Sequence, residues 1–452
     1  MADLDAIFKA YDIRGTTPDQ LDAPLAEAIG AAFARFVAAQ VGGARRVLVA
    51  RDMRESGVEL AAAFARGVQH QGLDVVDLGL ASTDLLYFAS GRLDSPGVML
   101  TASHNPAQYN GMKMCLPGAR PIGEESGLQE IKALAAAGLA PGEGPPGGYE
   151  RLDLLRDFGI HVRSFIDTSA LRPLKVVADT ANGMGGLVVP VVFEGLPVSL
   201  EIMYGELDGS FPNHPADPIQ PENLRDLQAR VLAVGADVGL AFDGDADRVF
   251  LVDDNGELLS GSLTTAIVAA GVLEKQPGAT ILHNCICSKA VPEVVRERGG
   301  TPVRTRVGHS FIKAVMADTG AAFGGEHSAH YYFADNWRAD SGSIAALLVL
   351  EQLSKAGVPL SELRRPFDRY AASGEINATV ADPHAVIEAV AAAYPADTQD
   401  RLDGLTVDLG DWWFNLRASN TEPLLRLNLE AADPASCAKR VAEVQALIDA
   451  AA

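Results

Sequence analysis

One arrangement of strands, loops and helices occurs three times in succession along the 452-residue chain. In each copy an apolar, β-rich run opens into a polar loop, and a helix, a second strand, another helix and a third strand are expected to follow. The three copies begin with RRVLVARDMRESG (45–57), LKVVADTANGMGG (174–186) and TILHNCICSKAV (280–291). Because strands that alternate with helices form largely parallel sheets, the repeat predicts three related mixed α/β domains.

The third strand of each copy opens into a loop that carries polar and titratable side chains. These segments are GVMLTASHNP (97–106), VGLAFDGDADR (238–248) and AAFGGEHSAH (321–330). Ligands of parallel sheets bind beyond the carboxyl ends of the strands. We therefore expect the three loops to converge in one central cleft.

The last part of the chain departs from this repeat. Residues 404–431 alternate between apolar and polar side chains, which predicts a small antiparallel sheet, and the residues from 434 onward predict a closing helix. A Pro/Gly-rich connection at 140–149 predicts a domain boundary. The expected fold class is α/β, with three related mixed α/β domains and a smaller C-terminal α+β domain. The expected domains are residues 1–148, 149–255, 256–367 and 368–452.

Composition and charge exclude several classes of protein. The chain is 48% hydrophobic and 21% charged, which is typical of a globular protein. It has no apolar run of the roughly 18 residues that a membrane span requires. A net charge of −22 argues against binding to nucleic acid or to an anionic membrane. The N-terminus lacks the features of a signal peptide and the four cysteines are scattered, so we expect a cytoplasmic protein without a disulfide framework.

Three aspartates recur at every second position in the FDGDADR loop, namely Asp243, Asp245 and Asp247. In an extended segment this spacing would place the carboxylates on one face, about 7 Å apart. Their mutual repulsion favours a bound cation, and oxygen ligands suit Mg²⁺. A calcium loop would continue with a glycine and a later acidic ligand, whereas here Arg248 and an apolar run follow. The remaining alternative is a solvated acidic turn, and the sequence favours magnesium over it.

Ser103 lies in the TASHNP loop that follows the strand of the first copy. A serine in such a place commonly caps a turn, and this loop lacks the surroundings of a hydrolase nucleophile. If the aspartate loop lies opposite, however, the Ser103 hydroxyl can accept and return a phosphoryl group. The phosphorylated serine would supply a further oxygen ligand to the cation. His104 and Lys113 would then hold or polarise the phosphoryl oxygens.

Two further loops carry groups suited to ligand binding, one to a polyol and the other to an anion. In GEHSAH, Glu326, Ser328 and His330 alternate as along a strand, and such groups can bind sugar hydroxyls and exchange a proton. A metal site through His327 and His330 is the alternative, but these residues lack the helical spacing of a zinc protease, and a structural role for His327 is favoured. The RASNTEP turn offers an anion cradle or is a plain hairpin turn. Its polar residues are Arg417, Ser419, Asn420 and Thr421.

The motifs TASHNPAQYNGMK, DGDADR, GEHSAH and RASNTEP occur in this order, and together they resemble the α-D-phosphohexomutase superfamily. The resemblance is closest to bacterial phosphomannomutase/phosphoglucomutase and runs from FKAYDIRG to the C-terminal helix. It implies four domains around a deep cleft. It also implies the interconversion of hexose 1-phosphate and hexose 6-phosphate, of mannose or glucose, through a phosphoserine enzyme and a bound hexose 1,6-bisphosphate.

The resemblance also assigns roles to particular residues. The metal ligands implied for Mg²⁺ are Ser103, Asp243, Asp245 and Asp247. The catalytic residues implied are Ser103, Lys113, Arg248, His309, His330 and Arg14. The substrate-binding residues implied are Tyr11, Lys289, Glu326, Ser328, Arg417, Ser419, Asn420 and Thr421. The group that takes the proton of the sugar hydroxyl is His309, His330 or Lys113, and the sequence does not choose among them.

Three positions depart from the pattern of the relatives. Ala246 stands where relatives often have Gly, and His327 and Ala329 replace a Met and a Gly of dual-specificity relatives. The sugar preference is therefore open, and a phosphoglucosamine mutase is an alternative, which His327 mildly disfavours. The expected partners are small sugar phosphates, with hexose 1,6-bisphosphate as activator, in a monomer or a dimer.

Two other functional classes compete with a mutase. A Mg²⁺-dependent sugar phosphatase would lose the phosphoryl group to water, but the sequence offers no dedicated water-activating base beside Ser103. A non-catalytic sugar-phosphate-binding protein would need neither the cation site nor the hydroxyl opposite it. We therefore favour the mutase.

Overall fold

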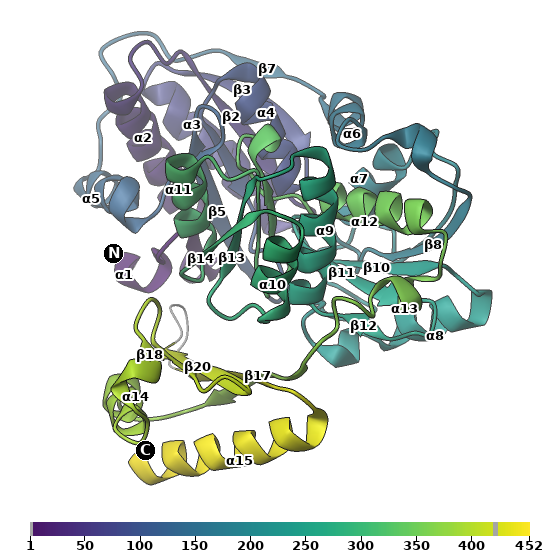
Figure 1. Ribbon diagram of the computed structural model, residues 1–452. Coiled ribbons are helices and arrows are strands. Elements are labelled where there is room, and N and C mark those ends of the chain that lie inside the picture. The colour runs from purple at the N-terminus through teal and green to yellow at the C-terminus, as the bar shows by residue number, and fades with distance from the viewer. Residues whose placement is uncertain (1–2, 419–423) are drawn as a thin grey trace. The chain divides into compact units, whose positions relative to one another are not determined.

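The computed structural model describes residues 3–418 and 424–452. Its contacts divide the chain into two compact units, one made of residues 1–260 and 328–363 and the other of residues 261–327 and 364–452. Figure 1 shows the elements of both units in chain order, from purple at the N-terminus to yellow at the C-terminus. None of the helices in the described ranges combines the length and the hydropathy that a bilayer span needs.

The first sheet, in the first unit, has seven strands. They are β1 (Ile13–Thr16), β2 (Arg46–Arg51), β3 (Asp74–Leu80), β4 (Gly97–Leu100), β5 (Tyr109–Leu116), β6 (Arg120–Pro121) and β7 (Tyr149–Arg151). Their order is β1-β5-β4-β2-β3-β7, and β6 pairs with β5. The strands β4, β2, β3 and β7 run parallel, whereas β5 is antiparallel to both β4 and β1. The sheet extends past residue 148, because β7 pairs with β3.

Helices cover this sheet and bury an apolar core against it. They are α1 (Leu4–Ile7), α2 (Ala23–Gln40), α3 (Ser56–His70), α4 (Thr83–Leu93), the 3₁₀ turn η1 (Glu124–Ser126) and α5 (Leu128–Ala137). The helices α2, α3 and α5 lie together on one side of the sheet (Figure 1). Phe33 on α2 and Phe64 on α3 pack with their ring centroids 5.8 Å apart. The apolar faces of α2 and α3 thereby fix the scaffold that carries β2 and β4.

The second sheet, also in the first unit, has five strands. They are β8 (Leu174–Asp179), β9 (Val198–Met203), β10 (Val238–Phe242), β11 (Val249–Asp253) and β12 (Leu258–Leu259). Their order is β12-β11-β10-β8-β9, in which β10, β8 and β9 are parallel and β11 returns antiparallel to β10. The neighbouring helices are α6 (Leu155–Arg163), η2 (Thr168–Ala170), α7 (Gly185–Val192), η3 (Pro221–Leu224) and α8 (Arg225–Val234).

Residues 328–363 complete the first unit. They contain β16 (Tyr331–Phe333), η4 (Ala334–Asn336), α12 (Gly342–Ala356) and α13 (Leu360–Leu363). The Ser341 side chain caps the start of α12 by accepting the backbone N–H of Ile344. The Tyr331 hydroxyl donates to the carbonyl of Val249, which ties this segment to β11.

The second unit begins with a smaller parallel sheet. Its elements are α9 (Gly261–Lys275), β13 (Thr280–Asn284), α10 (Ala290–Glu297), β14 (Thr301–Thr305), α11 (His309–Thr319) and β15 (Phe323–Gly325). The strand β13 pairs in parallel with β14 on one side and with β15 on the other.

The three parallel sheets share one topology, which confirms the repeat predicted from the sequence. In each, the first strand of the copy is central, the second lies on one side and the third on the other. The corresponding orders are β4-β2-β3, β10-β8-β9 and β15-β13-β14. Because the third strands are equivalent, the polar loops that follow them leave equivalent edges of the three sheets.

The C-terminal part of the second unit forms an antiparallel sheet, as its alternating pattern predicts. Its elements are β17 (Ala371–Ala378), α14 (Pro383–Ala391), η5 (Ala396–Thr398), β18 (Gln399–Asp400), β19 (Leu405–Asp408), β20 (Trp412–Ala418), β21 (Leu425–Ala431) and α15 (Pro434–Ala451). The strand order is β17-β21-β20-β19-β18. The helix α15 runs along this sheet (Figure 1) and packs Cys437, Val444 and Ile448 into its core.

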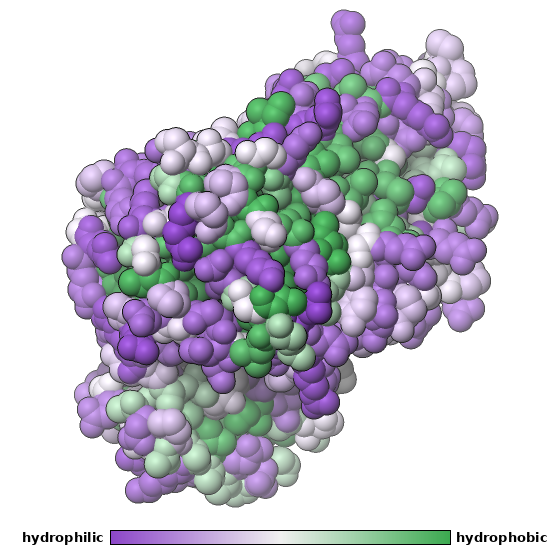
Figure 2. Space-filling model, turned by 90° about the vertical axis from the view of Figure 1, so that its right-hand side faces the viewer, coloured by the Kyte–Doolittle hydropathy of each residue, from purple (hydrophilic) through white to green (hydrophobic). Residues whose placement is uncertain are grey.

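Polar and apolar side chains both reach the face of the molecule shown in Figure 2. Hydrophilic side chains cover much of the face shown in Figure 2, and hydrophobic ones lie between them. Large exposed apolar side chains among the described residues are Val58, Leu80, Tyr149, Ile160, Ile219, Leu232 and Leu402. They are scattered along the chain, as is normal for a globular protein.

Candidate active site

Ser103 follows β4 and is almost completely buried. Its backbone has a φ of +50°, in the left-handed region that residues other than glycine rarely occupy. The Ser103 N–H donates to Thr101 Oγ1 at 2.9 Å. Its hydroxyl donates to Asp243 Oδ2 at 2.8 Å. The aspartate loop thus lies opposite the serine, the arrangement on which the phosphoryl-carrier hypothesis depends.

The aspartate loop connects β10 and β11, and its carboxylates are fully buried. One oxygen each of Asp243, Asp245 and Asp247 lies within 4.8 Å of the others. The expectation of an extended segment with a spacing of about 7 Å was wrong. The chain turns instead, since the Ala246 N–H donates to the Asp243 carbonyl and Ala246 has a φ of +59°. The turn brings the carboxylates closer together than an extended strand would.

Gly244 in this loop lies against the serine loop. A Cβ at this position would be 2.4 Å from the Ser103 carbonyl oxygen, closer than real Cβ contacts allow. The close contact between Gly244 and the Ser103 carbonyl keeps the Ser103 hydroxyl near the carboxylates of the aspartate loop. Any side chain at residue 244 would push the two loops apart.

Two cations neutralise most of the charge of the carboxylate cluster. Lys113 on β5 donates from Nζ to Asp245 Oδ2 and to Asp247 Oδ2, each at 2.7 Å. Arg248 donates from Nε to Asp243 Oδ2 at 2.9 Å. With all three aspartates ionised, as they would be around a bound cation, the two positive side chains leave one negative charge on the cluster.

The pKa values of the cluster follow from burial and from these cations. Burial raises the pKa of Asp243 to about 8, although Arg248 opposes the shift. Burial acts the same way on Asp245, but the Lys113 ammonium outweighs it and holds the Asp245 pKa below its usual range. Burial lowers the pKa of Lys113, and Asp245 and Asp247 reverse this to a pKa well above the usual range. Lys113 is therefore an ammonium ion in this arrangement.

The donor set fits a divalent cation that prefers oxygen ligands. Asp245 Oδ1 and Asp247 Oδ1 are buried and make no hydrogen bond. Buried carboxylate oxygens without hydrogen bonds are costly, and a cation would remove that cost. Convergent carboxylates are the ligands that Mg²⁺ selects in proteins.

Arg248 and His104 flank the serine hydroxyl. Arg248 Nη2 lies 3.2 Å from Ser103 Oγ and 2.5 Å from His104 Nδ1, and His104 Nδ1 lies 3.3 Å from Ser103 Oγ. Burial and the neighbouring Arg248 lower the pKa of His104 well below its usual range. The imidazole is therefore neutral and accepts a hydrogen bond from Arg248.

Arg14 on β1 belongs to the same region, because β1 pairs with β5. Its guanidinium donates to Asn105 Oδ1 at 2.5 Å and to Asp12 Oδ2 at 2.6 Å. Tyr11 lies just before β1 and is half-buried. Arg14 thus contacts the serine loop through Asn105, whereas no contact with the carboxylate cluster is seen.

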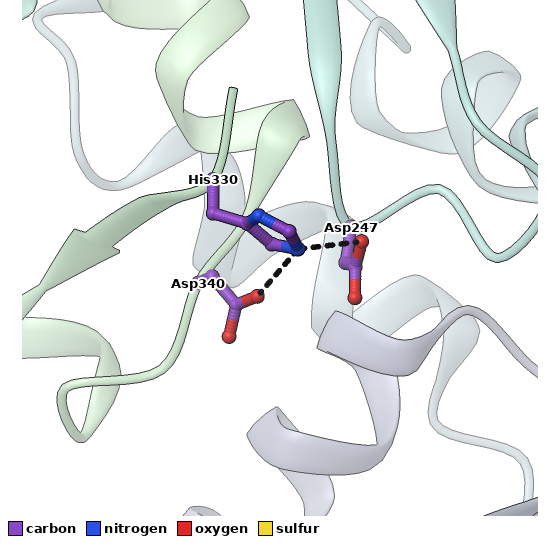
Figure 3. A group of neighbouring side chains, drawn as sticks. All are labelled: Asp247, His330 and Asp340. Carbon is purple, nitrogen blue, oxygen red and sulfur yellow. Dashed lines mark ion pairs between the residues drawn. The ribbon is translucent and has the colours of Figure 1, made fainter. Parts of the chain in front are cut away.

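His330 lies between two carboxylates, as Figure 3 shows. Its Nε2 is 3.8 Å from Asp247 Oδ1 and 4.0 Å from Asp340 Oδ2. Its Nδ1 lies 3.1 Å from Ser328 Oγ. The His330 side chain is 21% exposed to solvent, whereas the carboxylates of Asp247 and Asp340 are buried. The imidazole therefore reaches the edge of the cluster and remains accessible to a ligand.

The structure adds residues that the sequence reasoning missed. Thr83, the first residue of α4, donates its N–H to the Asp245 carbonyl at 3.0 Å and its hydroxyl to Asp245 Oδ2 at 2.5 Å. Asp84 beside it accepts the Ser341 hydroxyl at 2.6 Å and the Ser82 hydroxyl. Burial raises the pKa of Asp84 to about 7. A Ser-Thr-Asp sequence at a helix start looks like an ordinary cap, so nothing in the sequence signalled this contact.

Within the second unit, Glu326 follows β15 and is buried. His327 accepts or donates a hydrogen bond with Ser262 Oγ at 3.1 Å, and burial lowers its pKa. The expected strand-like alternation from Glu326 to His330 was wrong, because residues 327–329 turn and Ala329 has a φ of +66°. Among the described residues, the groups able to hold a metal do not include His327.

Lys289 and Arg417 are the two positively charged residues among those predicted to bind the substrate. Lys289 precedes α10 and pairs through Nζ with Asp408 Oδ1 at 2.6 Å. Arg417 on β20 is largely buried and lies 3.5 Å from Glu375 Oε2. Ser419, Asn420 and Thr421, between β20 and β21, lie outside the described residues, as does the side chain of His309.

Comparisons with known proteins agree with this architecture. Models of the phosphoglucomutase/phosphomannomutase domains match in order: α/β/α domain I over residues 5–140, domain II over 157–256, domain III over 260–370 and the C-terminal domain over 375–447. The chain is 41% identical over 437 residues to a phosphomannomutase of Salmonella montevideo, covering 94% of each chain. It is 41% identical over 448 residues to a protein of Xanthomonas campestris named for phosphohexose mutases, covering 98% of each.

A solved structure gives the same result. A phosphoglucomutase/phosphomannomutase family protein from Burkholderia thailandensis superposes with a TM-score of 0.90 at 36% identity, covering 100% of this chain and 98% of the other. The fold and the matches define a phosphohexomutase, a class of mutase enzyme. Within that class, the chain belongs to the phosphoglucomutase/phosphomannomutase family.

Proposed function

We propose that the protein interconverts hexose 1-phosphate and hexose 6-phosphate, of mannose or glucose, through a phosphoserine at Ser103 and a bound hexose 1,6-bisphosphate. The observation that carries the proposal is the Ser103 hydroxyl, which lies 2.8 Å from Asp243 within a buried cluster of three carboxylates. In this place a phosphorylated serine can give its phosphoryl group to the 6-hydroxyl of hexose 1-phosphate, which forms the bisphosphate. The serine hydroxyl can then take the phosphoryl group from C1 of the bisphosphate, which leaves hexose 6-phosphate.

Asp243, Asp245 and Asp247 would hold Mg²⁺, with an oxygen at Ser103 as a further ligand. The ion would supply positive charge for the oxygens of the transferring phosphoryl group. Thr83 would fix the orientation of Asp245 through its two hydrogen bonds. The orientation of the ligands is thus set by buried contacts of the first unit.

Arg248 and Lys113 would stabilise the charge on the phosphoryl group during transfer. Phosphoryl transfer depends on positioning and charge neutralisation more than on covalent chemistry by the protein. Arg248 already contacts the Ser103 hydroxyl at 3.2 Å. Lys113 would move from its carboxylate partners to the phosphoryl oxygens when a cation binds at the aspartates.

We assign the proton transfer to His330. Its ring is accessible and lies between Asp247 and Asp340, which would stabilise it after it accepts the proton of the attacking sugar hydroxyl. Lys113 is less suited, because its ammonium group donates to two carboxylates. His330 would return the proton in the second half-reaction.

Lys289, Glu326 and Arg417 would bind the substrate, with Tyr11, Ser328, Ser419, Asn420 and Thr421 as further contacts. Arg417 offers a guanidinium for bidentate contact with the phosphate that is not reacting. Arg14 would orient the serine loop through Asn105. The preference for mannose or glucose is left to the test.

The assay uses purified protein with Mg²⁺ and a trace of hexose 1,6-bisphosphate. Mannose 1-phosphate and glucose 1-phosphate are compared, and glucosamine 1-phosphate is included. Formation of the 6-phosphate is expected, and the ratio of kcat/KM values assigns the sugar. Release of free phosphate without isomerisation would contradict the mutase and favour a sugar phosphatase.

A further inference from the structure

Arg54 is buried beneath the serine loop, with 1% of its side chain exposed. Its guanidinium has five N–H donors, and each has an acceptor. Nε donates to Asp52 Oδ2 at 3.2 Å, Nη1 to the carbonyls of Pro106 at 2.8 Å and Tyr109 at 2.9 Å, and Nη2 to the carbonyls of Ser103 at 2.9 Å and Asn105 at 2.6 Å. Four of these acceptors belong to one stretch of seven residues, the loop that carries the candidate nucleophile.

Asp52 explains how a guanidinium can be buried here. It follows β2 directly, and its N–H donates to the carbonyl of Leu100, the last residue of β4. Asp52 Oδ1 accepts the Arg54 N–H at 3.0 Å, and Oδ2 accepts its Nε. The charge of Arg54 is therefore neutralised on the side away from the loop. What Arg54 offers the serine loop is a fixed set of donors rather than net charge.

A second segment closes over the guanidinium. The ring centroid of Phe211 lies 5.2 Å from Arg54 Cζ. Gly209 permits this approach, because a Cβ there would be 2.7 Å from Arg54 Cα. The ring covers the guanidinium, whose side chain is only 1% exposed, and so limits the access of water to its hydrogen bonds.

The conformation of Ser103 requires such support. A serine with a φ of +50° persists only where its neighbours hold it. The peptide group before Ser103 is held by Thr101 Oγ1, and the carbonyl after it is held by Arg54 Nη2. Both sides of the residue are thus fixed while its hydroxyl faces Asp243.

We propose that Arg54 is a positioning residue, whose five hydrogen bonds hold the serine loop so that the Ser103 hydroxyl faces the carboxylate cluster. The inference rests on the proposed function, since it assumes that Ser103 carries the phosphoryl group. Lysine cannot replace Arg54, because an ammonium has three donors and lacks the planar fork that spans four carbonyls.

The test compares Arg54→Lys with Arg46→Lys. Arg46 lies at the opposite end of β2 and donates to Ser95 and Leu93, away from the serine loop. We expect Arg54→Lys to lower kcat by about 100-fold, the loss typical of a nucleophile misplaced by about 1 Å. KM for hexose 1-phosphate stays unchanged, and phosphorylation of Ser103 by hexose 1,6-bisphosphate slows by the same factor. Arg46→Lys retains the wild-type kcat and rate of phosphorylation.

Each outcome has a definite meaning. If Ser103→Ala keeps its activity, the proposed function fails first. If Ser103→Ala is inactive but Arg54→Lys turns over as fast as Arg46→Lys, the positioning role of Arg54 is wrong. Equal losses in kcat for both arginine variants would also contradict it, because they would indicate general destabilisation.

A second variant serves if Arg54→Lys does not fold. Phe211→Ala keeps Arg54 and all its acceptors but admits water to the guanidinium, and this water competes for the hydrogen bonds that hold the serine loop. We expect its kcat to fall several-fold at an unchanged KM, with protection from hydrogen exchange reduced at Asn105 and Tyr109. A wild-type kcat together with unchanged exchange in Phe211→Ala would overturn the proposal.

Discussion

The polar groups around Ser103 and those at Lys289 are held in different ways. Around Ser103 the carboxylates and cations are buried, and each makes at least one hydrogen bond with a neighbour in the cluster. Lys289 pairs with Asp408, and the side chains of the two residues are 25% and 53% exposed to solvent, respectively. A pair of this kind contributes at most about 1 kcal/mol. Breaking the pair of Lys289 with Asp408 therefore costs little free energy, whereas removing one member of the buried cluster would leave a buried charge unpaired.

This difference separates two tasks that a phosphohexomutase must perform. The region around Ser103 requires fixed geometry, because phosphoryl transfer depends on the position of the reacting atoms. In the proposed function, Lys289 and Arg417 bind the substrate, and Arg417 must hold the unreacting phosphate and release it in each cycle. Substitutions in the first region should therefore lower kcat, and substitutions in the second should mainly raise KM.

The largest effect is expected from Ser103→Ala. Removing the phosphoryl carrier should lower kcat by at least about 10⁴-fold, as for other nucleophiles. Ser95→Ala, just before β4, also removes a buried hydroxyl and should stay close to wild type. Initial rates with a saturating hexose 1-phosphate measure both. Wild-type turnover by Ser103→Ala would show that Ser103 does not carry the phosphoryl group, and the two regions would then not divide the tasks as described.

His330→Gln should have the next largest effect. Loss of a proton-transfer group lowers kcat by about 10²- to 10⁴-fold. His327→Gln is the matched control from the same loop, since His327 is buried and contacts Ser262. Its kcat should change much less. Similar kcat values for the two variants would show that His330 does not transfer the proton.

Arg417→Ala tests the second region. The loss of charge-assisted hydrogen bonds to a phosphate, about 1.5–3 kcal/mol, should raise KM by about 10- to 100-fold. The variant should also release hexose 1,6-bisphosphate during turnover, which chromatography of the reaction mixture measures. Arg426→Ala is the control, because Arg426 pairs with the same Glu375 from the neighbouring strand. A raised KM without released bisphosphate would contradict the proposal that Arg417 retains the bisphosphate by holding the phosphate that is not reacting.

Thr83→Val should weaken binding of Mg²⁺ by about 10- to 100-fold, the usual cost of losing a residue that orients a metal ligand. Its hydroxyl donates to Asp245 Oδ2. Ser90→Ala on the same helix also removes a buried hydroxyl, but one that contacts the carbonyls of Ser95 and Leu116. Calorimetric titration with Mg²⁺ distinguishes them. Equal Mg²⁺ affinity in the two variants would show that Thr83 does not orient the ligand.

The smallest effect concerns stability rather than activity. Burial raises the pKa of Asp84 from 3.8 to about 7, so the folded state binds a proton that the unfolded state has lost. The contribution of Asp84 to the free energy of unfolding is therefore full below about pH 4, falls as pH rises towards 7 and is level above that. Asp84→Asn should remove this dependence. Urea unfolding at pH 5 and pH 8 measures it, and parallel curves for the two proteins would contradict the assignment.

Much of the fold follows from the sequence, because the repeat predicts equivalent strands. Ser103 and Asp243 follow equivalent third strands, and this equivalence predicted that their loops lie near each other. The local path of the aspartate loop did not follow, since a turn with Ala246 in the left-handed region has no signature in the pattern. Contacts from distant segments were also missed.

Arg54 and Thr83 show why such contacts escape sequence reasoning. The sequence alone does not distinguish a buried arginine that donates to backbone carbonyls, such as Arg54, from an arginine on the surface. The Thr83 hydroxyl reaches a carboxylate on another sheet, 162 positions away in the chain. Only the packing of the two sheets within the first unit brings these groups together.

The most direct test of the account is the chemical identity of the phosphoryl carrier. The purified protein is incubated with labelled hexose 1,6-bisphosphate and Mg²⁺, the reaction is quenched, and the label is located by mass spectrometry of the peptides. The account predicts one phosphoryl group per chain, on Ser103, which hexose 1-phosphate removes as the bisphosphate forms. Label on another residue, or none at all in an active enzyme, would contradict it.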